Sequence, residues 1–151
     1  MSTAGLKPPT CPDATARELA QQAACMPCPF CPPALDPAQV ILQNTHCLFL
    51  QQPEPVLVGS GLVVPRQHRE TVFDLTADEW QATFSLLQQV KALLDRQYAP
   101  DGYNIGWNCS RVGGQEVFHA HLHVIPRYRD EPFAGKGIRY WLKQEANRRR
   151  K

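Results

Sequence analysis

Hydrophobic positions divide the chain into several short runs and one longer segment of helical periodicity. Short runs rich in β-branched and aromatic residues predict five strands, at residues 40–44, 46–50, 61–65, 103–109 and 119–126. Between the third and the fourth run, apolar residues recur three and four positions apart, which predicts an amphipathic helix. Strands on both sides of one helix favour an α+β fold with a mainly antiparallel sheet.

The predicted helix has a defined start and an apolar stripe. Thr76 and Glu79 have the spacing of a capping box, in which each side chain bonds the backbone N–H of the other residue. The stripe follows at spacings of four, three, four and three: Trp80, Phe84, Leu87, Lys91 and Leu94. A Pro-Asp-Gly sequence at residues 100–102 then ends the region.

The N-terminal part of the chain differs from the rest. Eight of the fourteen prolines lie in residues 1–37, which excludes a continuous helix or sheet there. Within it, Asp13–Ala24 contains helix formers and no breaker, which predicts a short helix. We therefore expect an extension over residues 1–38 with a cysteine cluster, a main domain over residues 39–130, and a polar, basic tail over residues 131–151.

Composition and charge exclude several classes of protein. A length of 151 residues fits one domain, and 43% apolar with 20% charged residues excludes wholesale disorder. No apolar run exceeds about four residues, far fewer than the roughly 20 that a membrane helix needs. The first residues contain no apolar signal region, so we expect a cytoplasmic protein. The net charge of +2 does not by itself indicate nucleic-acid binding, and a basic tail such as NRRRK is usually solvated.

Cysteine spacing indicates a metal in the N-terminal part. In a reducing compartment, closely spaced cysteines bind metal more often than they form disulfides. Cys28 and Cys31 have the Cys-x-x-Cys spacing of a zinc half-site, and Cys25 forms a competing pair with Cys28. The same spacing also fits a redox-active pair or simply reduced thiols.

Three histidines alternate with apolar residues in the last predicted strand. Because residues two apart share a face, His119, His121 and His123 point one way, while Ala120 and Leu122 face the other side. His119 and His123 are about 13 Å apart along a strand, so one zinc ion can hardly bind all three. At least one imidazole is left for chemistry, and a neutral imidazole is a competent nucleophile and acid–base catalyst near pH 7.

Amide and glycine residues precede the histidines: Asn108, Gly113, Gly114 and Gln115. A glycine-containing turn can bring backbone N–H groups close to an anionic oxygen. A histidine nucleophile beside neutral donors suits transfer at a phosphorus centre, where catalysis is mostly positioning and charge stabilisation.

These residues resemble the histidine triad (HIT) superfamily. The likeness rests on residues 102–127, which end in His-Ala-His-Leu-His-Val-Ile-Pro-Arg, and on Gly-Ser-Gly-Leu-Val-Val-Pro-Arg-Gln-His at residues 59–68. It implies a HIT-like fold, with about five antiparallel strands and one main helix, in which residues 39–130 form the catalytic domain. It further implies a homodimeric nucleotide hydrolase or transferase that cleaves at the α-phosphate through a nucleotidyl-histidine. The implied substrates are dinucleoside polyphosphates or nucleoside phosphoramidates.

Roles follow from the resemblance residue by residue. It makes His121 the nucleophile, His123 a contact to a phosphate oxygen, and Asn108 and Gln115 the amides that bind phosphate. His121, His123 and Gln115 form the implied catalytic set. Gln52 aligns with a position that binds ribose hydroxyls. Many bacterial relatives bind structural zinc through a Cys-x-Phe-Cys sequence and two histidines, which implies the ligands Cys28, Cys31, His68 and His119. That division leaves His121 and His123 for chemistry.

Three positions depart from the family pattern. Glu116 stands where many members have Ser or Thr, Gln52 replaces Asp or Asn, and Ser60 replaces a frequent histidine. These departures affect the expected substrate preference but not the expected class of reaction. Two other hypotheses remain open at this point: a nucleotide-binding or scaffold protein with weakened catalysis, and a zinc protein whose histidines serve only as ligands.

Overall fold

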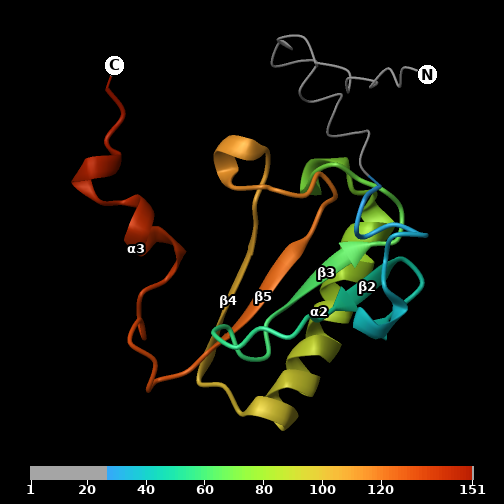
Figure 1. Cartoon of the computed structure of the whole chain (residues 1–151), viewed down its shortest axis with the longest axis horizontal. Coiled ribbons are helices and arrows are strands. Elements are labelled where there is room, and N and C mark those ends of the chain that lie inside the picture. The colour runs from blue at the N-terminus through green and yellow to red at the C-terminus, as the bar shows by residue number, and fades with distance from the viewer. Residues whose placement is uncertain (1–26, 151) are drawn as a thin grey trace, which may run out of the picture.

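The computed structural model describes residues 27–150 and consists of a five-stranded sheet with one long helix packed against it (Figure 1). The strands are β1 (Val40–Gln43), β2 (Cys47–Leu50), β3 (Gly61–Pro65), β4 (Gly102–Trp107) and β5 (Leu122–Arg127). The α-helices are α2 (Ala77–Tyr98) and α3 (Ile138–Leu142), and 3-10 turns lie at Pro37–Gln39, Val72–Asp74, Arg111–Gly113 and Glu145–Asn147. The strand order is β1-β2-β3-β5-β4, and every neighbouring pair is antiparallel.

The predicted fold class is confirmed, and so are five strands, with changes at their ends. β3 matches the prediction to the residue, and the short helix predicted over Asp13–Ala24 lies outside the described residues. The prediction that a strand begins at His119 is wrong, because β5 begins at Leu122. Just ahead of β5, the Ala120 N–H donates instead to the carbonyl of Arg69, at 2.6 Å, in the loop that follows β3.

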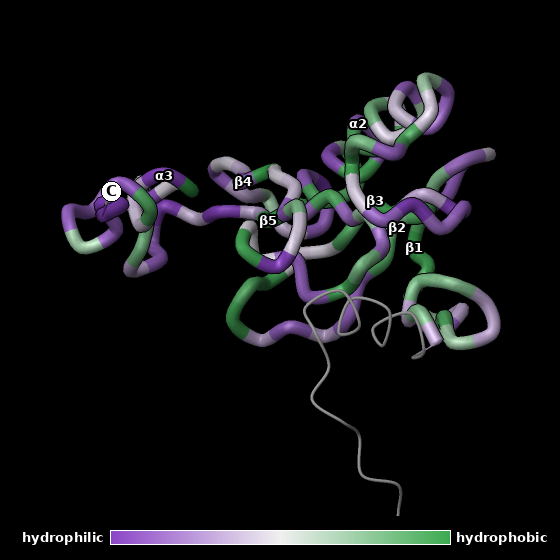
Figure 2. Tube along the Cα trace, turned by 90° about the horizontal axis from the view of Figure 1, so that it is seen from above, coloured by the Kyte–Doolittle hydropathy of each residue, from purple (hydrophilic) through white to green (hydrophobic). Residues whose placement is uncertain are grey.

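Both faces of the sheet are covered, which explains why all four residues of β2 are buried. One core cluster joins α2 to the sheet: Leu86, Val90 and Leu94 with Cys47, Phe49, Val63, Leu122 and Val124. On the opposite face, Phe30 packs against Leu48, Leu50 and Val64. Because Leu122 and Val124 face α2, His123 between them faces the side of Phe30. Figure 2 views the sheet with α2 above it and shows the strands side by side in the order β4, β5, β3, β2 and β1.

The capping box of α2 is confirmed, but the predicted helix stripe is partly wrong. The Thr76 hydroxyl accepts from the Glu79 N–H at 3.2 Å, and the Glu79 carboxylate accepts from the Thr76 N–H at 2.8 Å. Trp80 and Phe84 are each 54% exposed. Only Leu94 of the predicted stripe is among the buried residues of the helix, which are Glu79, Thr83, Leu86, Val90 and Leu94. Two polar residues at the start of the buried face account for the misassigned stripe, since the prediction followed apolar positions.

The tail contains more structure than the polar pattern predicted. The short helix α3 lies beyond the β4 edge of the sheet in both views (Figures 1 and 2). Lys136 lies over the rings of Phe133, Tyr140 and Trp141, at 5.1, 5.2 and 6.0 Å from their centroids. Cation–π contacts of this kind hold the segment together locally. Across residues 27–150, no helix combines the length and apolar character needed to cross a membrane.

Candidate functional site

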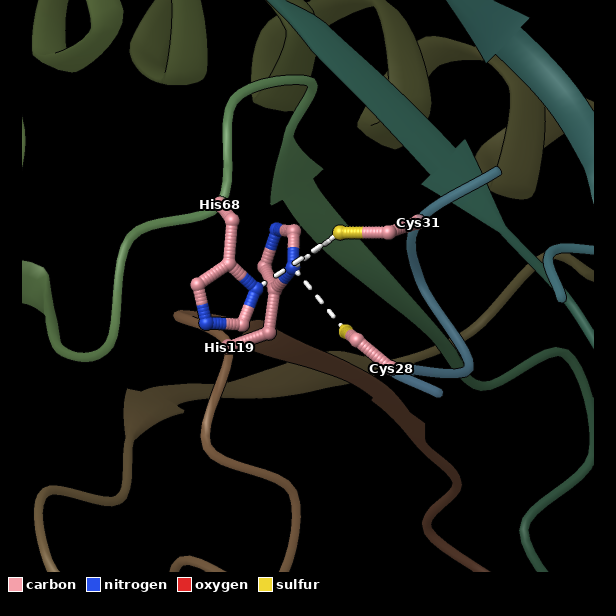
Figure 3. A group of neighbouring side chains, drawn as sticks. All are labelled: Cys28, Cys31, His68 and His119. Carbon is pink, nitrogen blue, oxygen red and sulfur yellow. Dashed lines mark hydrogen bonds between the residues drawn. The ribbon is translucent and has the colours of Figure 1, made fainter. Parts of the chain in front are cut away.

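Two cysteines and two histidines from distant parts of the chain meet beside the sheet (Figure 3). Cys28 and Cys31 come from the segment before β1, His68 from the loop after β3, and His119 from the segment that leads into β5. Their Sγ and ring nitrogen atoms all lie within 4.8 Å of one another. The structure therefore brings together the four residues that the resemblance implied, and Cys25 lies outside the described residues.

The separations in this cluster fit a tetrahedral metal site. The His119 Nδ1 atom lies 3.4 Å from both sulfur atoms, and the His68 Nδ1 atom lies 3.6 Å from the Cys31 sulfur. A zinc ion bound at about 2.3 Å from sulfur and 2.0 Å from nitrogen sets its ligand atoms about 3.5 Å apart. These three separations are close to that value, and the four donors together form a candidate site for one metal ion.

The tautomer of His119 is suited to a ligand. Its Nε2 atom lies 2.8 Å from the Pro65 carbonyl oxygen, which can only accept, so Nε2 carries the proton and the Nδ1 lone pair faces the two thiols. Burial lowers the pKa of His119, and the Pro65 carbonyl opposes that shift without cancelling it. A neutral imidazole oriented through its second nitrogen is the usual state of a histidine ligand.

The loop that contains His68 is anchored by a buried ion pair that the sequence gave no sign of. The Arg69 Nε atom donates to both carboxylate oxygens of Glu79, at 3.0 and 3.1 Å, and Glu79 is only 3% exposed. The carbonyls of Arg69 and Glu70 accept from the Ala120 N–H and from the Gln115 side chain, both at 2.6 Å. This loop therefore links the start of α2 to the histidine segment.

His121 is held with one ring nitrogen free. Its Nδ1 atom lies 2.8 Å from the His119 carbonyl oxygen and must donate there, so the Nε2 atom keeps its lone pair. The residue is 7% exposed, and its ring centroid lies 4.9 Å from that of His123 and 5.6 Å from that of Phe30. A fixed tautomer with a free lone pair is what a nucleophilic histidine requires.

His123 and Asn108 contact each other. The Asn108 amide nitrogen lies 3.4 Å from the His123 Nε2 atom and 3.4 Å from the Gly114 carbonyl oxygen. Burial lowers the pKa of His123, and a positive charge on His121 would lower it further. The neutral form of His123 is therefore favoured, and the pair places a ring and an amide donor next to His121.

Gln115 ties the turn before the histidines to the rest of the fold. Its amide nitrogen donates to the carbonyls of Glu70 and Val117, at 2.6 and 3.1 Å, and its carbonyl accepts from the Ser110 N–H at 2.8 Å. With a side chain that is 2% exposed and fully engaged, Gln115 has no free donor in this arrangement. Its role as a phosphate ligand stays a prediction.

A pocket opens beside the histidines on the face of the sheet opposite α2. Its lining includes Phe30, Leu50, Gln52, Ser60, Leu62 and His123. Gln52 is exposed, and its amide nitrogen donates to the Gln39 side chain at 3.2 Å. The apolar side chains, with a few amide and hydroxyl groups and the Glu54 carboxylate, suit a flat, partly polar ligand such as a nucleoside.

Glu116 is exposed to solvent at the start of the histidine segment. Two arginines of the neighbouring segments, Arg111 and Arg127, make other contacts. Arg111 lies over the Phe118 ring at 5.1 Å, and Arg127 pairs with Glu131. The Glu116 side chain therefore remains exposed to solvent.

Comparison with known proteins identifies the family. A family model described as "HIT domain" matches residues 35–130. The chain belongs to the HIT family. This confirms the predicted superfamily and assigns the sheet, α2 and the histidine segment to one HIT domain.

Relatives of this HIT protein include proteins with and without a named activity. The chain is 38% identical to an uncharacterized HIT-like protein of Methanocaldococcus jannaschii over 94 residues, covering 61% of this chain and 70% of that protein. It is 35% identical to the bis(5'-adenosyl)-triphosphatase of Saccharomyces cerevisiae (strain YJM789), covering 60% of this chain and 45% of the yeast enzyme. A solved HIT family structure from Bacillus anthracis is 32% identical, with a TM-score of 0.57, covering 61% and 65% of the two chains.

Two residues that support the histidines, Phe30 and Arg69, were not predicted from the sequence. Phe30 contacts His119 and His121 edge-on and lines the pocket, although the sequence marks it only as a spacer between two cysteines. Arg69 anchors the loop that contains His68, and its partner Glu79 had been assigned only a capping role. Both contacts join residues far apart in sequence, so no local pattern could have indicated them.

Proposed function

We propose that this HIT protein is a nucleotide hydrolase or transferase in which His121 forms a covalent bond to the α-phosphorus of its substrate. The observation that carries the proposal is the geometry of His121, whose Nδ1 atom donates to the His119 carbonyl at 2.8 Å. The Nε2 lone pair is therefore available for attack, beside a pocket lined by His123.

The reaction proceeds in two steps. The Nε2 atom of neutral His121 attacks the α-phosphorus, a nitrogen–phosphorus bond forms, and the leaving group departs with its electron pair and takes a proton. Water, or another acceptor in a transfer reaction, then attacks phosphorus and loses a proton. The nitrogen–phosphorus bond breaks, its electron pair returns to His121, and the nucleotide product is released.

The neighbours of His121 act through position and charge in this scheme. His123 and Asn108, whose side chains are 3.4 Å apart, contact the phosphate oxygens. Gln115 keeps the turn in place through three hydrogen bonds, and Gln52 contacts the ribose from the pocket wall. The rigid placement of these groups lowers the barrier because little reorganisation is needed during the reaction.

Two substrate classes have support. Similarity to the yeast bis(5'-adenosyl)-triphosphatase favours dinucleoside polyphosphates. Nucleoside phosphoramidates are the second class that the family resemblance implies. Turnover of diadenosine polyphosphates compared with adenosine phosphoramidate decides between the two classes.

The nucleophile is tested with His121→Ala. We expect a loss of kcat by about four orders of magnitude or more, with the Kd for adenosine 5'-monophosphate changed little, because a nucleophile acts in the transition state. In the wild type, mass spectrometry after an alkaline quench should find one nucleotidyl group on the peptide that contains His121. The matched control is His46→Ala, an exposed histidine outside the site. A His121→Ala protein with a tenth of wild-type turnover would exclude the assignment.

Zinc is the metal that we propose for the Cys28, Cys31, His68 and His119 cluster. Two thiols and two imidazoles at tetrahedral spacing are a structural zinc donor set, in which the protein fills every position. The ion would attach the segment before β1 to the sheet. A thiolate site of this kind fits a reducing compartment and so supports the predicted cytoplasmic location.

A homodimer through β4 is the assembly that we propose. β4 is an edge strand, and its sequence GYNIGW has none of the lysines or prolines that protect exposed edges. Beside it, Trp80 stacks on Trp107 at 6.2 Å, and Trp80 and Phe84 are each 54% exposed. Exposed aromatic rings next to an edge strand favour burial against a second copy of the chain.

A further inference from the structure

Phe30 belongs to two sites at once. It lies between the candidate ligands Cys28 and Cys31, and it also lines the pocket with Gln52 and His123. The side chain is 7% exposed, so nearly all of its surface is in contact with other residues. One aromatic ring therefore separates the thiol cluster from the nucleoside pocket.

The ring of Phe30 also touches a histidine from each site. Its centroid lies 5.8 Å from that of His119, with an interplanar angle of 83°, and 5.6 Å from that of His121, with an angle of 65°. Both are edge-to-face contacts, which depend on ring orientation. A displacement of Phe30 would change the surroundings of a candidate ligand and of the proposed nucleophile together.

The segment around Phe30 is attached to the sheet by its side chains. The Cys31 N–H donates to the Cys28 carbonyl at 3.0 Å, which closes a turn of the segment on itself. The apolar contacts of Phe30 with Leu48, Leu50 and Val64 form one attachment. The thiol contacts to His119 form the second, and the two attachments are only one to two residues apart.

We propose that metal binding and nucleotide binding are positively coupled through Phe30. The proposal rests on the proposed nucleotide site and on the zinc assignment above. Metal bound by Cys28 and Cys31 fixes the backbone on both sides of Phe30, which orders the pocket wall before a nucleotide arrives. The first ligand to bind then bears the entropy cost of ordering that segment, and the second ligand does not. Each ligand therefore increases the affinity for the other.

Thermodynamic linkage relates the effect of zinc on nucleotide affinity to the effect of nucleotide on zinc affinity. The factor by which zinc tightens nucleotide binding must equal the factor by which nucleotide tightens zinc binding. Ordering the backbone of one residue corresponds to a change of about tenfold in a binding constant. We therefore expect both ratios to be about tenfold, and to be equal.

Two titrations measure the two ratios. Calorimetry gives the Kd for adenosine 5'-monophosphate of zinc-loaded protein and of protein stripped with a chelator. Competition with a chromophoric chelator gives the Kd for zinc with and without saturating adenosine 5'-monophosphate. Circular dichroism of the stripped protein checks that the sheet is retained, and the Cys28→Ser/Cys31→Ser variant gives a second metal-free form for the first titration.

Substitution of Phe30 tests its part in the coupling. Phe30→Ala keeps all four metal donors, so zinc should still bind, but both ratios should fall to about one. Phe30→Leu keeps apolar bulk and should retain part of the coupling, which serves as a second variant if the alanine protein folds poorly. The matched control is Phe73→Ala, because Phe73 is 84% exposed, and both ratios should stay at the wild-type value.

The possible failures are distinguishable. If zinc-loaded wild-type protein does not bind adenosine 5'-monophosphate, the proposed function fails and the coupling with it. If both ligands bind but the wild-type ratios are one, only the coupling is excluded. If the ratios stay near tenfold in Phe30→Ala, the coupling exists but does not pass through Phe30, and the proposal is wrong.

Discussion

Replacing Glu79 by glutamine should destabilise the fold at neutral pH by about 2 kcal/mol. The wild-type carboxylate is 3% exposed and accepts two bonds from Arg69 and one from the Thr76 N–H. The glutamine carbonyl can keep the bond to Thr76 but loses the charge-assisted interaction with the Arg69 Nε–H, and a hydrogen bond to a charged group contributes about 1.5–3 kcal/mol. Because the Arg69 side chain is 33% exposed, it can be rehydrated, which keeps the loss below the cost of stranding a fully buried charge.

The effect of this substitution should depend on pH. Burial by itself raises the pKa of Glu79, but the Arg69 guanidinium and the Thr76 N–H outweigh burial and hold that pKa below its ordinary value of 4.5. The folded state therefore favours the carboxylate, and its stabilisation is present above pH 4.5 and lost as the pH falls through the lowered pKa. Glutamine does not titrate, so the difference between the two proteins should shrink in acid.

Thermal unfolding of both proteins between pH 3 and pH 7 measures this difference. For a chain of this size, about 2 kcal/mol corresponds to a fall in Tm of about 4–8 °C near pH 7. Glu70→Gln, next to Arg69 but exposed, is the control and should leave Tm unchanged. A Tm difference that stays constant or widens below pH 4.5 would refute the reasoning.

Three further substitutions test other parts of the site. Cys28→Ser with Cys31→Ser should abolish binding of one zinc equivalent per chain, measured by atomic absorption, and lower Tm because the ion no longer ties the segment to the sheet. Glu116→Ser should raise turnover modestly or leave it unchanged in steady-state assays, and a large drop would give the carboxylate a direct role. Phe84→Glu should shift a dimer towards monomer in sedimentation, whereas Gln88→Glu, on an exposed part of α2, should not.

Local patterns predicted the parts of the fold that depend on local interactions. The run of β-branched and apolar residues at 61–65 gave the bounds of β3, and the spacing of Thr76 and Glu79 gave the start of α2. In both cases the deciding interactions lie within a few residues of each other. The set Cys28, Cys31, His68 and His119 came instead from the family resemblance, because no periodicity joins residues so far apart.

Contacts between distant segments explain what the sequence did not predict. The α2 stripe was misassigned because Glu79 and Thr83 lie on the buried face, where Arg69 and the Cys47 thiol contact them. In each case a polar or charged group satisfied by a tertiary contact overrides the binary pattern.

The late start of β5 explains how one short segment can serve two sites. Along a regular strand, His119 and His123 would be separated by about 13 Å and would face a single site. Here the Ala120 N–H bonds to Arg69 rather than to a neighbouring strand, and the Pro65 carbonyl turns the His119 lone pair towards the thiols. His121 bonds to its own chain through Nδ1, which leaves the Nε2 lone pair free. The loop that bonds Ala120 also contains His68, so a change in this loop acts on the metal cluster and on the proposed nucleophile together.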